Sequence, residues 1–104
     1  MKVEESIYVA KLFDAYGGML SDGQQKILNY YLNYDYTITE IAEKLNVSRQ
    51  AVLDSINKGG KKLRAYEEKL NLVKKMDQLI MQNQKFIAEN QKLKVKLEKL
   101  SQKE

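Results

Sequence analysis

The residues best suited to chemistry in this chain lie together in the run SRQAVLDSINKGGK. The spacing of Val52 and Ile56 predicts a helix there, with both side chains on its buried side. At 100° per residue, Arg49, Gln50 and Asn57 then lie on the outer side or on its shoulder. Gln and Asn can form paired hydrogen bonds with adenine, and Arg can bind guanine or phosphate. The face predicted to bind DNA, or else a partner molecule, consists of Ser48, Arg49, Gln50, Leu53, Asp54, Asn57, Lys58 and Lys61.

Two residues on the same face favour a protein partner instead. Asp54 lies in the middle of it, where a carboxylate repels phosphates and pairs only with the amino group of cytosine. Leu53 beside it is unusual for reading a DNA groove and ordinary for a protein contact. A cation at position 49, at the start of the helix, is disfavoured by the helix macrodipole by about 0.3–1 kcal/mol. A binding role and simple exposure to solvent explain its presence there equally well. Both interpretations stay open.

The composition argues against an enzyme. The 104 residues include no cysteine and no histidine, so a thiol nucleophile, a thiolate metal site and the commonest general base are all missing. The carboxylates are scattered on predicted helical surfaces. We therefore expect no catalytic residues, no metal and no cofactor.

Charge and hydropathy bound the partners and the location. Of the net charge of +4, residues 1–36 carry −2, residues 37–70 carry +2 and residues 71–104 carry +4. A basic second half suits an anionic partner, although a solvated lysine-rich helix is the commoner reason. No apolar run approaches the roughly 18 residues of a membrane span, and the N-terminus does not resemble a signal peptide. We expect a cytoplasmic protein without membrane insertion.

The candidate face belongs to a helix-turn-helix pattern. Thr37 and Glu40 form a T-x-x-E capping box at the start of a first helix. Asn46 is suited to the left-handed conformation that ends such a helix, and Ser48 is an N-cap for the second one. These signals at the right offsets predict two short helices joined by a tight turn.

Three further features concern packing. Residues 7–16 are apolar around most of a helix, which predicts burial on more than one side. Four tyrosines between positions 30 and 36 could stack on nucleic-acid bases, but the rim of a small core is the favoured interpretation. Gly59 and Gly60 predict either a kink or the close approach of a neighbouring backbone.

The last third of the chain shows a heptad pattern. Its predicted dimerisation residues are Leu72, Met76, Leu79, Asn83, Phe86, Asn90, Leu93, Leu97 and Leu100. The two asparagines occupy a positions, where Asn specifies register and favours two strands. This seam is out of phase with the apolar positions before it, so we expect a bend or break near Leu70–Leu72. The sequence predicts a helix-turn-helix domain over residues 1–70, a coiled-coil helix over residues 71–104, and a homodimer.

The run LSDGQQKILNYYLNYDYTITEIAEKLNVSRQAVLDSI resembles the YlxM family of small bacterial proteins, whose domain is similar to region 4 of sigma factors. The resemblance covers roughly residues 7–72, and its most specific part is Ser-Arg-Gln-Ala-Val after a Glu-Ile-Ala helix. Lys58-Gly59-Gly60 departs from the family pattern. The resemblance implies an all-α, sigma-region-4-like fold and a helix-turn-helix regulator with a role in the signal recognition particle pathway. We therefore expect a DNA-binding regulator, with a protein- or RNA-binding accessory factor of that particle as the alternative.

Overall fold

The computed structural model describes residues 2–102, which are helical almost throughout and contain no β-strand. The elements are α1 (Val3–Tyr16), the 3-10 turn η1 (Gly17–Met19), α2 (Asp22–Asn33), α3 (Ile38–Leu45), α4 (Arg49–Leu70) and α5 (Leu72–Gln102). The expected all-α fold is confirmed, and it includes both helices of the helix-turn-helix and the long C-terminal helix.

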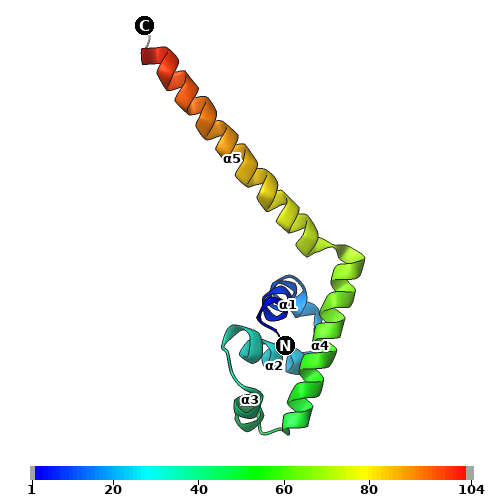
Figure 1. The fold of residues 1–104 in the computed structure, drawn as a ribbon. Coiled ribbons are helices and arrows are strands. Elements are labelled where there is room, and N and C mark those ends of the chain that lie inside the picture. The colour runs from blue at the N-terminus through cyan, green and yellow to red at the C-terminus, as the bar shows by residue number, and fades with distance from the viewer. Residues whose placement is uncertain (1, 103–104) are drawn as a thin grey trace. The chain divides into compact units, whose positions relative to one another are not determined.

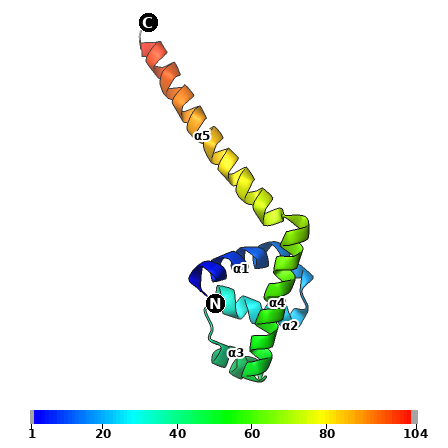
Figure 2. The ribbon, with the colours of Figure 1, turned by 45° about the vertical axis from the view of Figure 1, so that its right-hand side comes forward.

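The chain divides into two compact units, residues 1–73 and residues 74–104. In the first unit α1, α2 and α3 all pack against α4. Figures 1 and 2 show α3 beside the end of α4 that begins at Arg49, and α1 nearer its other end. The described part of the second unit, residues 74–102, is the rest of α5.

The ends of α3 and the start of α4 are formed by the residues that the sequence predicts. The Thr37 hydroxyl accepts a hydrogen bond from the Glu40 amide at 3.1 Å, and the Glu40 carboxylate accepts one from the Thr37 amide at 3.3 Å. Asn46 is left-handed, with φ of 55°, and Ser48 accepts a hydrogen bond from the Ala51 amide at 3.0 Å. The capping box and the tight turn are therefore confirmed.

The core of the first unit lies between α4 and the three helices packed on it. Its buried apolar residues are Val9, Leu12, Tyr16, Leu20, Ile27, Leu28, Ile41, Ala42, Val52, Ile56, Leu63 and Val73. From α1 only Val9, Leu12 and Tyr16 are buried, and these follow one another at helical spacing. Ile7 is 57% exposed, since it lies about 200° around the helix from Val9. Within a single chain α1 is therefore buried along one side, and its burial on a further side, against a second copy, stays a prediction.

Of the two glycines in α4, Gly59 is the one that admits a neighbour. A Cβ atom on Gly59 would lie 2.7 Å from Cδ1 of Leu28, whereas one on Gly60 would meet nothing within 4 Å. α4 continues through both positions. The glycine therefore allows α2 to approach α4 closely, through a side chain rather than through backbone.

The break between α4 and α5 occurs at Asn71, within the range that the change of seam predicts. Asn71 is left-handed, with φ of 54°, and its amide donates to the Glu67 carbonyl at 2.8 Å. The first amides of α5 are satisfied from the core, because Leu72 donates to the Tyr16 hydroxyl and Val73 donates to the Glu67 carboxylate, each at 3.0 Å. Tyr16 and Glu67 thus fix where α5 begins.

Candidate nucleic-acid interface

The candidate face comprises Ser48, the N-cap of α4, and the outer side of this helix from Arg49 to Lys61. Val52 and Ile56 are buried and hold this part of the helix against the core. All eight residues of the predicted face are exposed. A partner could therefore reach every one of them, and their role in binding stays a prediction.

Two residues of the face are bonded to each other. The Gln50 side-chain amide donates to the Asp54 carboxylate at 3.0 Å, one helical turn away. This bond occupies part of the hydrogen-bonding capacity of both groups. The i, i+4 spacing could have predicted it. The nitrogen of Gln50 carries two N–H groups, so one can stay bonded to Asp54 while the other and the amide oxygen bind an adenine.

The cations on this face are not neutralised within the chain. Within residues 2–102, no ion pair involves Arg49, Lys58 or Lys61. Arg64, further along the same helix, donates instead to Glu5 of α1 at 2.7 Å. That hydrogen bond from Arg64 holds the pKa of Glu5 below its ordinary value. The charges of Arg49, Lys58 and Lys61 are therefore available to an anionic partner.

The apolar residue on the face offers a small anchor. Leu53 is 37% exposed, the lowest exposure among the large apolar side chains that are exposed in the described chain. Protein contacts are centred on apolar or aromatic side chains that become fully desolvated on binding. The exposed area of Leu53 is modest for that purpose, which weakens the protein-binding interpretation without removing it.

The tyrosine cluster joins α2 to α3. The rings of Tyr30 and Tyr36 are stacked, with centroids 5.2 Å apart and an interplanar angle of 3°. Lys44 of α3 places its ammonium 5.4 Å and 5.6 Å from their centroids, within the range of a cation–π contact. Tyr30, Tyr31 and Tyr36 pack against the core, as expected for its rim, whereas Tyr34 is 61% exposed.

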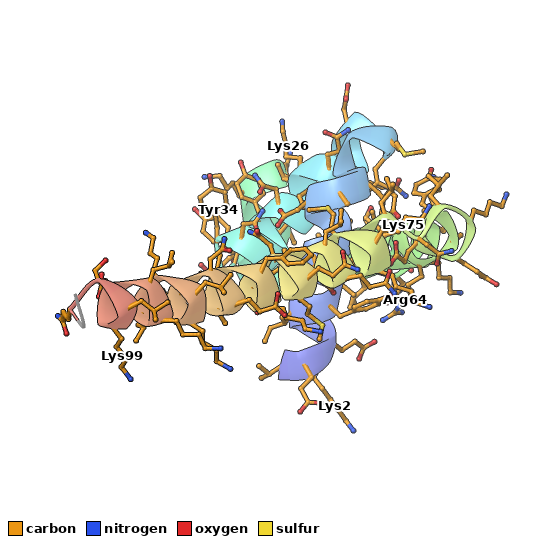
Figure 3. The ribbon with its side chains drawn as sticks, turned by 90° about the horizontal axis from the view of Figure 1, so that it is seen from above. Lys2, Lys26, Tyr34, Arg64, Lys75 and Lys99 are labelled. Atoms are coloured by element: carbon orange, nitrogen blue, oxygen red, sulfur yellow. The ribbon has the colours of Figure 1, made fainter. Side chains whose placement is uncertain are left out.

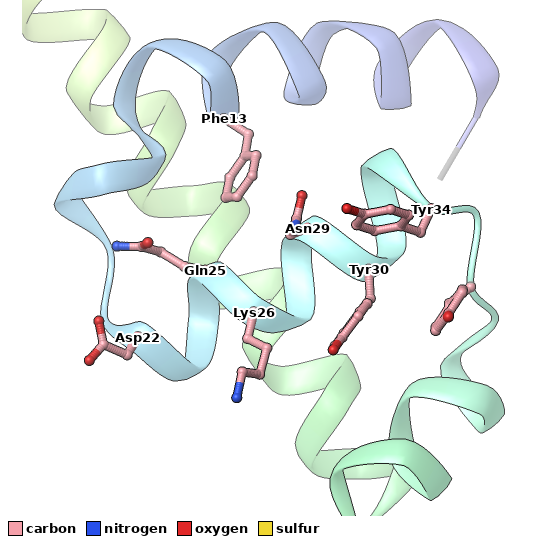
Figure 4. Close-up of a pocket in the computed structure, with 8 residues that line it drawn as sticks. Phe13, Asp22, Gln25, Lys26, Asn29, Tyr30 and Tyr34 are labelled. Atoms are coloured by element: carbon pink, nitrogen blue, oxygen red, sulfur yellow. The ribbon is translucent and has the colours of Figure 1, made fainter.

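An open pocket of about 590 Å³ lies next to this cluster. Phe13 of α1, Lys26, Asn29 and Tyr30 of α2, and Tyr34 directly after α2 are among the residues that line it (Figure 4). No residue of the predicted DNA-binding face lines this pocket. The two features are therefore separate.

The predicted dimerisation seam is exposed along the whole of α5. Leu79, Phe86 and Leu93 are 64%, 59% and 56% exposed, and the other seam residues are exposed as well. Val73, beside the first seam residue, is the one buried side chain in this helix. Side chains project from α5 on all sides, with Lys75 and Lys99 labelled near its two ends (Figure 3). Dimerisation through the seam stays a prediction.

Comparison with known protein families identifies the chain. A family model described as "Putative helix-turn-helix protein, YlxM / p13 like" matches residues 3–103. The chain belongs to this family. The match spans both the helix-turn-helix unit and α5, and the resemblance seen in the sequence is confirmed.

Individual members of the family are similar over part of their length. A UPF0122 protein of Caldanaerobacter subterraneus subsp. tengcongensis is 42% identical over 78 residues, which are 74% of this chain and 66% of the relative. One of Acetivibrio thermocellus is 53% identical over 66 residues, 64% of this chain and 56% of the relative. One of Lactococcus lactis subsp. cremoris is 43% identical over 72 residues, which are 69% of this chain and 65% of the relative. The chain thus spans about two thirds or less of these relatives' length.

Two features of the described residues of this family member bear on its partners. No helix in residues 2–102 is both long and apolar enough to cross a bilayer. The same residues contain no group of three or more Asp or Glu side chains placed to hold a metal ion.

Proposed function

We propose that the chain is a DNA-binding regulatory protein of the bacterial cytoplasm that contacts the major groove with α4. The observation that carries this proposal is the set of exposed, un-neutralised cations on α4, beside amide side chains, in a helix-turn-helix with a formed turn. In this motif the second helix enters the major groove and its N-terminal residues reach the base edges.

The positions along α4 suggest separate roles. Arg49 and Gln50 lie in the first turn, where base edges come within reach. Lys58 and Lys61 lie about 14–18 Å further along the helix, at 1.5 Å per residue. Since the groove is about 12 Å wide, these lysines are placed for phosphates at its border. The capped start of α4 fixes the orientation of the first two side chains.

We further propose that the seam of α5 pairs two copies of the chain. Asn83 and Asn90 both occupy a positions. In a parallel pair each asparagine meets its own copy and can form an amide–amide hydrogen bond. In an antiparallel pair a positions face d positions, so the asparagines would face apolar side chains. The parallel arrangement is therefore favoured, and it supplies two copies of α4 for two half-sites.

A second candidate function is favoured by the pair Leu53 and Asp54. In it the same face contacts a protein or RNA component of the signal recognition particle, as the family resemblance implies. The partly exposed Leu53 would then be the anchor, and the carboxylate of Asp54 would meet a basic partner. The exposed cations around them suit DNA better.

The test is a titration of duplex DNA at several salt concentrations. Binding driven by phosphate contacts weakens steeply as salt rises. Arg49→Ala should either lower the salt slope by about one, which marks a phosphate contact, or relax the preference at one base pair. Arg64→Ala is the matched control, because Arg64 lies on the same helix and is already paired with Glu5. Asp54→Asn should strengthen binding to any duplex.

The alternative gives a different result in the same set of variants. If the face binds a protein, Leu53→Ala should abolish capture of a signal recognition particle component from the host while duplex affinity hardly changes. The DNA proposal is wrong if no duplex binds even at about 50 mM salt, where phosphate contacts are strong.

A further inference from the structure

Four lysines form a stripe along the second unit of the chain. At 100° per residue, Lys85, Lys92, Lys96 and Lys99 of α5 lie within about 60° of one another around the helix axis. All four are exposed. Over 14 residues at 1.5 Å each, this lysine stripe is about 21 Å long.

Most of the lysine stripe lies away from the apolar seam. Lys85, Lys92 and Lys99 occupy c positions of the heptad, roughly 130° around the helix from the neighbouring seam residues, so a second copy bound to the seam leaves these three exposed. Lys96 occupies a g position and borders the seam. Ala88 and Val95 lie along its border, and together with three of the lysines they line a shallow groove of about 480 Å³. The groove has a small apolar floor and a basic edge.

The charge of the lysine stripe is not balanced by the chain. In the part of the chain that the structure describes, no ion pair involves any of the four lysines. Glu89 lies at one edge of the stripe, and Glu98 lies well away from it, on the other side of the helix. The surface is therefore a straight row of lysines with one carboxylate, Glu89, at its edge.

We propose that the lysine stripe binds the phosphate backbone of double-stranded DNA, as a contact additional to α4. DNA carries one negative charge per about 1.7 Å of its axis, so its backbone offers charge along the whole length of the row. The lysines are point charges without a planar hydrogen-bonding group, which suits phosphates rather than base edges. Binding should therefore be independent of sequence. The proposal rests on the DNA partner proposed for α4.

The position of the lysines argues against a lipid surface as the partner. A helix that lies on a membrane buries its apolar face and keeps its polar face toward water. Here Lys85, Lys92 and Lys99 lie roughly 130° around the helix from the apolar seam, so inserting the seam into lipid would point these three lysines away from the headgroups. A rigid anion that approaches from the polar side does not meet this difficulty.

The test compares two double variants of the full chain that have the same net charge. Lys85→Gln with Lys92→Gln removes two lysines of the stripe at c positions, away from the seam, and Lys75→Gln with Lys94→Gln removes two lysines from the borders of the seam on the same helix. Binding to a long duplex of random sequence is followed by fluorescence anisotropy. The stripe variant should lower the salt slope by about 1.8 and weaken binding at least about tenfold at about 50 mM salt. The border variant should change both much less, and light scattering checks that the two variants keep the same oligomeric state.

The possible results separate this proposal from the one for α4. Binding that needs the stripe but not Arg49 supports the stripe and refutes groove reading by α4. Binding that needs Arg49, with equal effects of the two double variants, overturns the stripe alone. The stripe proposal is also overturned if the stripe variant loses binding to anionic phosphatidylglycerol vesicles, or to duplex RNA, while it still binds duplex DNA as the unmodified chain does. Absence of duplex binding by the unmodified chain overturns both proposals.

Discussion

The phenol of Tyr16 donates a hydrogen bond to the carboxylate of Glu67, with 2.6 Å between the oxygens, although the two residues are 51 positions apart. Both side chains are buried, and both accept a hydrogen bond from the first amides of α5. A carboxylate at this place also suits the positive end of the helix dipole. The pair therefore joins α1, α4 and the start of α5 at one point.

Replacing Tyr16 by Phe tests this junction. The variant keeps the ring in the core but removes the donor to Glu67 and the acceptor for Leu72, so buried polar groups lose their partners. We expect a lower melting temperature, measured by circular dichroism. Tyr66→Phe is the control, because Tyr66 packs on Tyr16 and its hydroxyl makes no hydrogen bond within residues 2–102. Equal effects of the two substitutions would contradict the assigned role.

The same junction predicts a loss of stability at alkaline pH. Burial, with the Glu67 carboxylate as the next cause, raises the pKa of Tyr16 above its ordinary value of 10.0. The folded chain then keeps this proton to higher pH than the unfolded chain. Its stabilising contribution is complete below pH 10.0 and is lost as pH rises through the folded value. Urea titrations should show the advantage of the unmodified chain over Tyr16→Phe shrinking above that pH, and a constant advantage would contradict the assignment.

Thr37→Ala tests the frame of the helix-turn-helix. The substitution removes the side-chain half of the capping box and should lower the free energy of unfolding by about 0.5–2 kcal/mol. Thr39→Ala serves as the control, since Thr39 is exposed in the same turn and caps nothing. Chemical denaturation measures both. A cost for Thr39→Ala as large as that for Thr37→Ala would show that the cap is not its source.

The adjacent glycines of α4 should respond in opposite directions to alanine. Gly59→Ala places a Cβ atom 2.7 Å from Leu28 Cδ1, and Leu28 is completely buried, so its side chain would have to shift within the core. We expect this variant to lose stability, by the about 1–3 kcal/mol typical of overpacking less the gain in helix propensity. Gly60→Ala meets no atom within 4 Å and should gain about 0.4–1 kcal/mol. Denaturant titrations that gave the same sign for both would contradict the packing of α2 on α4.

The seam of α5 can be tested against another face of the same helix. Leu79→Ser with Leu93→Ser removes two d positions, and we expect light scattering to report a shift from dimer to monomer. Met81→Ser with Val95→Ser removes two exposed apolar side chains from f positions and should leave the dimer intact. A dimer that survives the first pair of substitutions would place the interface elsewhere in the chain. The exposed Ile7 and Tyr8 of α1 would then be the next candidates.

The sequence predicts best where local chemistry decides the structure. Thr37, Asn46 and Ser48 each act within three or four residues of their own position, and the structure confirms all three. The buried side of α1 could not be read in this way, because a helix that is apolar nearly all round carries no mark of which side is covered. Tertiary packing alone selects Val9 over Ile7.

The contacts that join distant segments were beyond prediction. Glu67 lies among the lysines and glutamates of α4 and looks like a solvated residue, and nothing near it in sequence points to Tyr16. The one sequence feature that pointed to this junction was the shift in phase of the apolar positions near residue 71, which predicts a break in the helix there. For the candidate face the period of the helix is enough to predict exposure. The hydrogen bond between Gln50 and Asp54, and the lysine stripe of α5, also follow from that period but were missed.

The distance in sequence between Tyr16 and Glu67 also matters for how the chain is made. Closing a loop of 51 residues costs about 2 kcal/mol more entropy than closing the five-residue turn from Ala42 to Val47. During synthesis α1 leaves the ribosome well before α4, the helix on which it mainly packs, and its apolar stripe has no complete partner until then. The helix-turn-helix can form as soon as the first turns of α4 emerge. The first unit is complete only when Val73 has emerged as well.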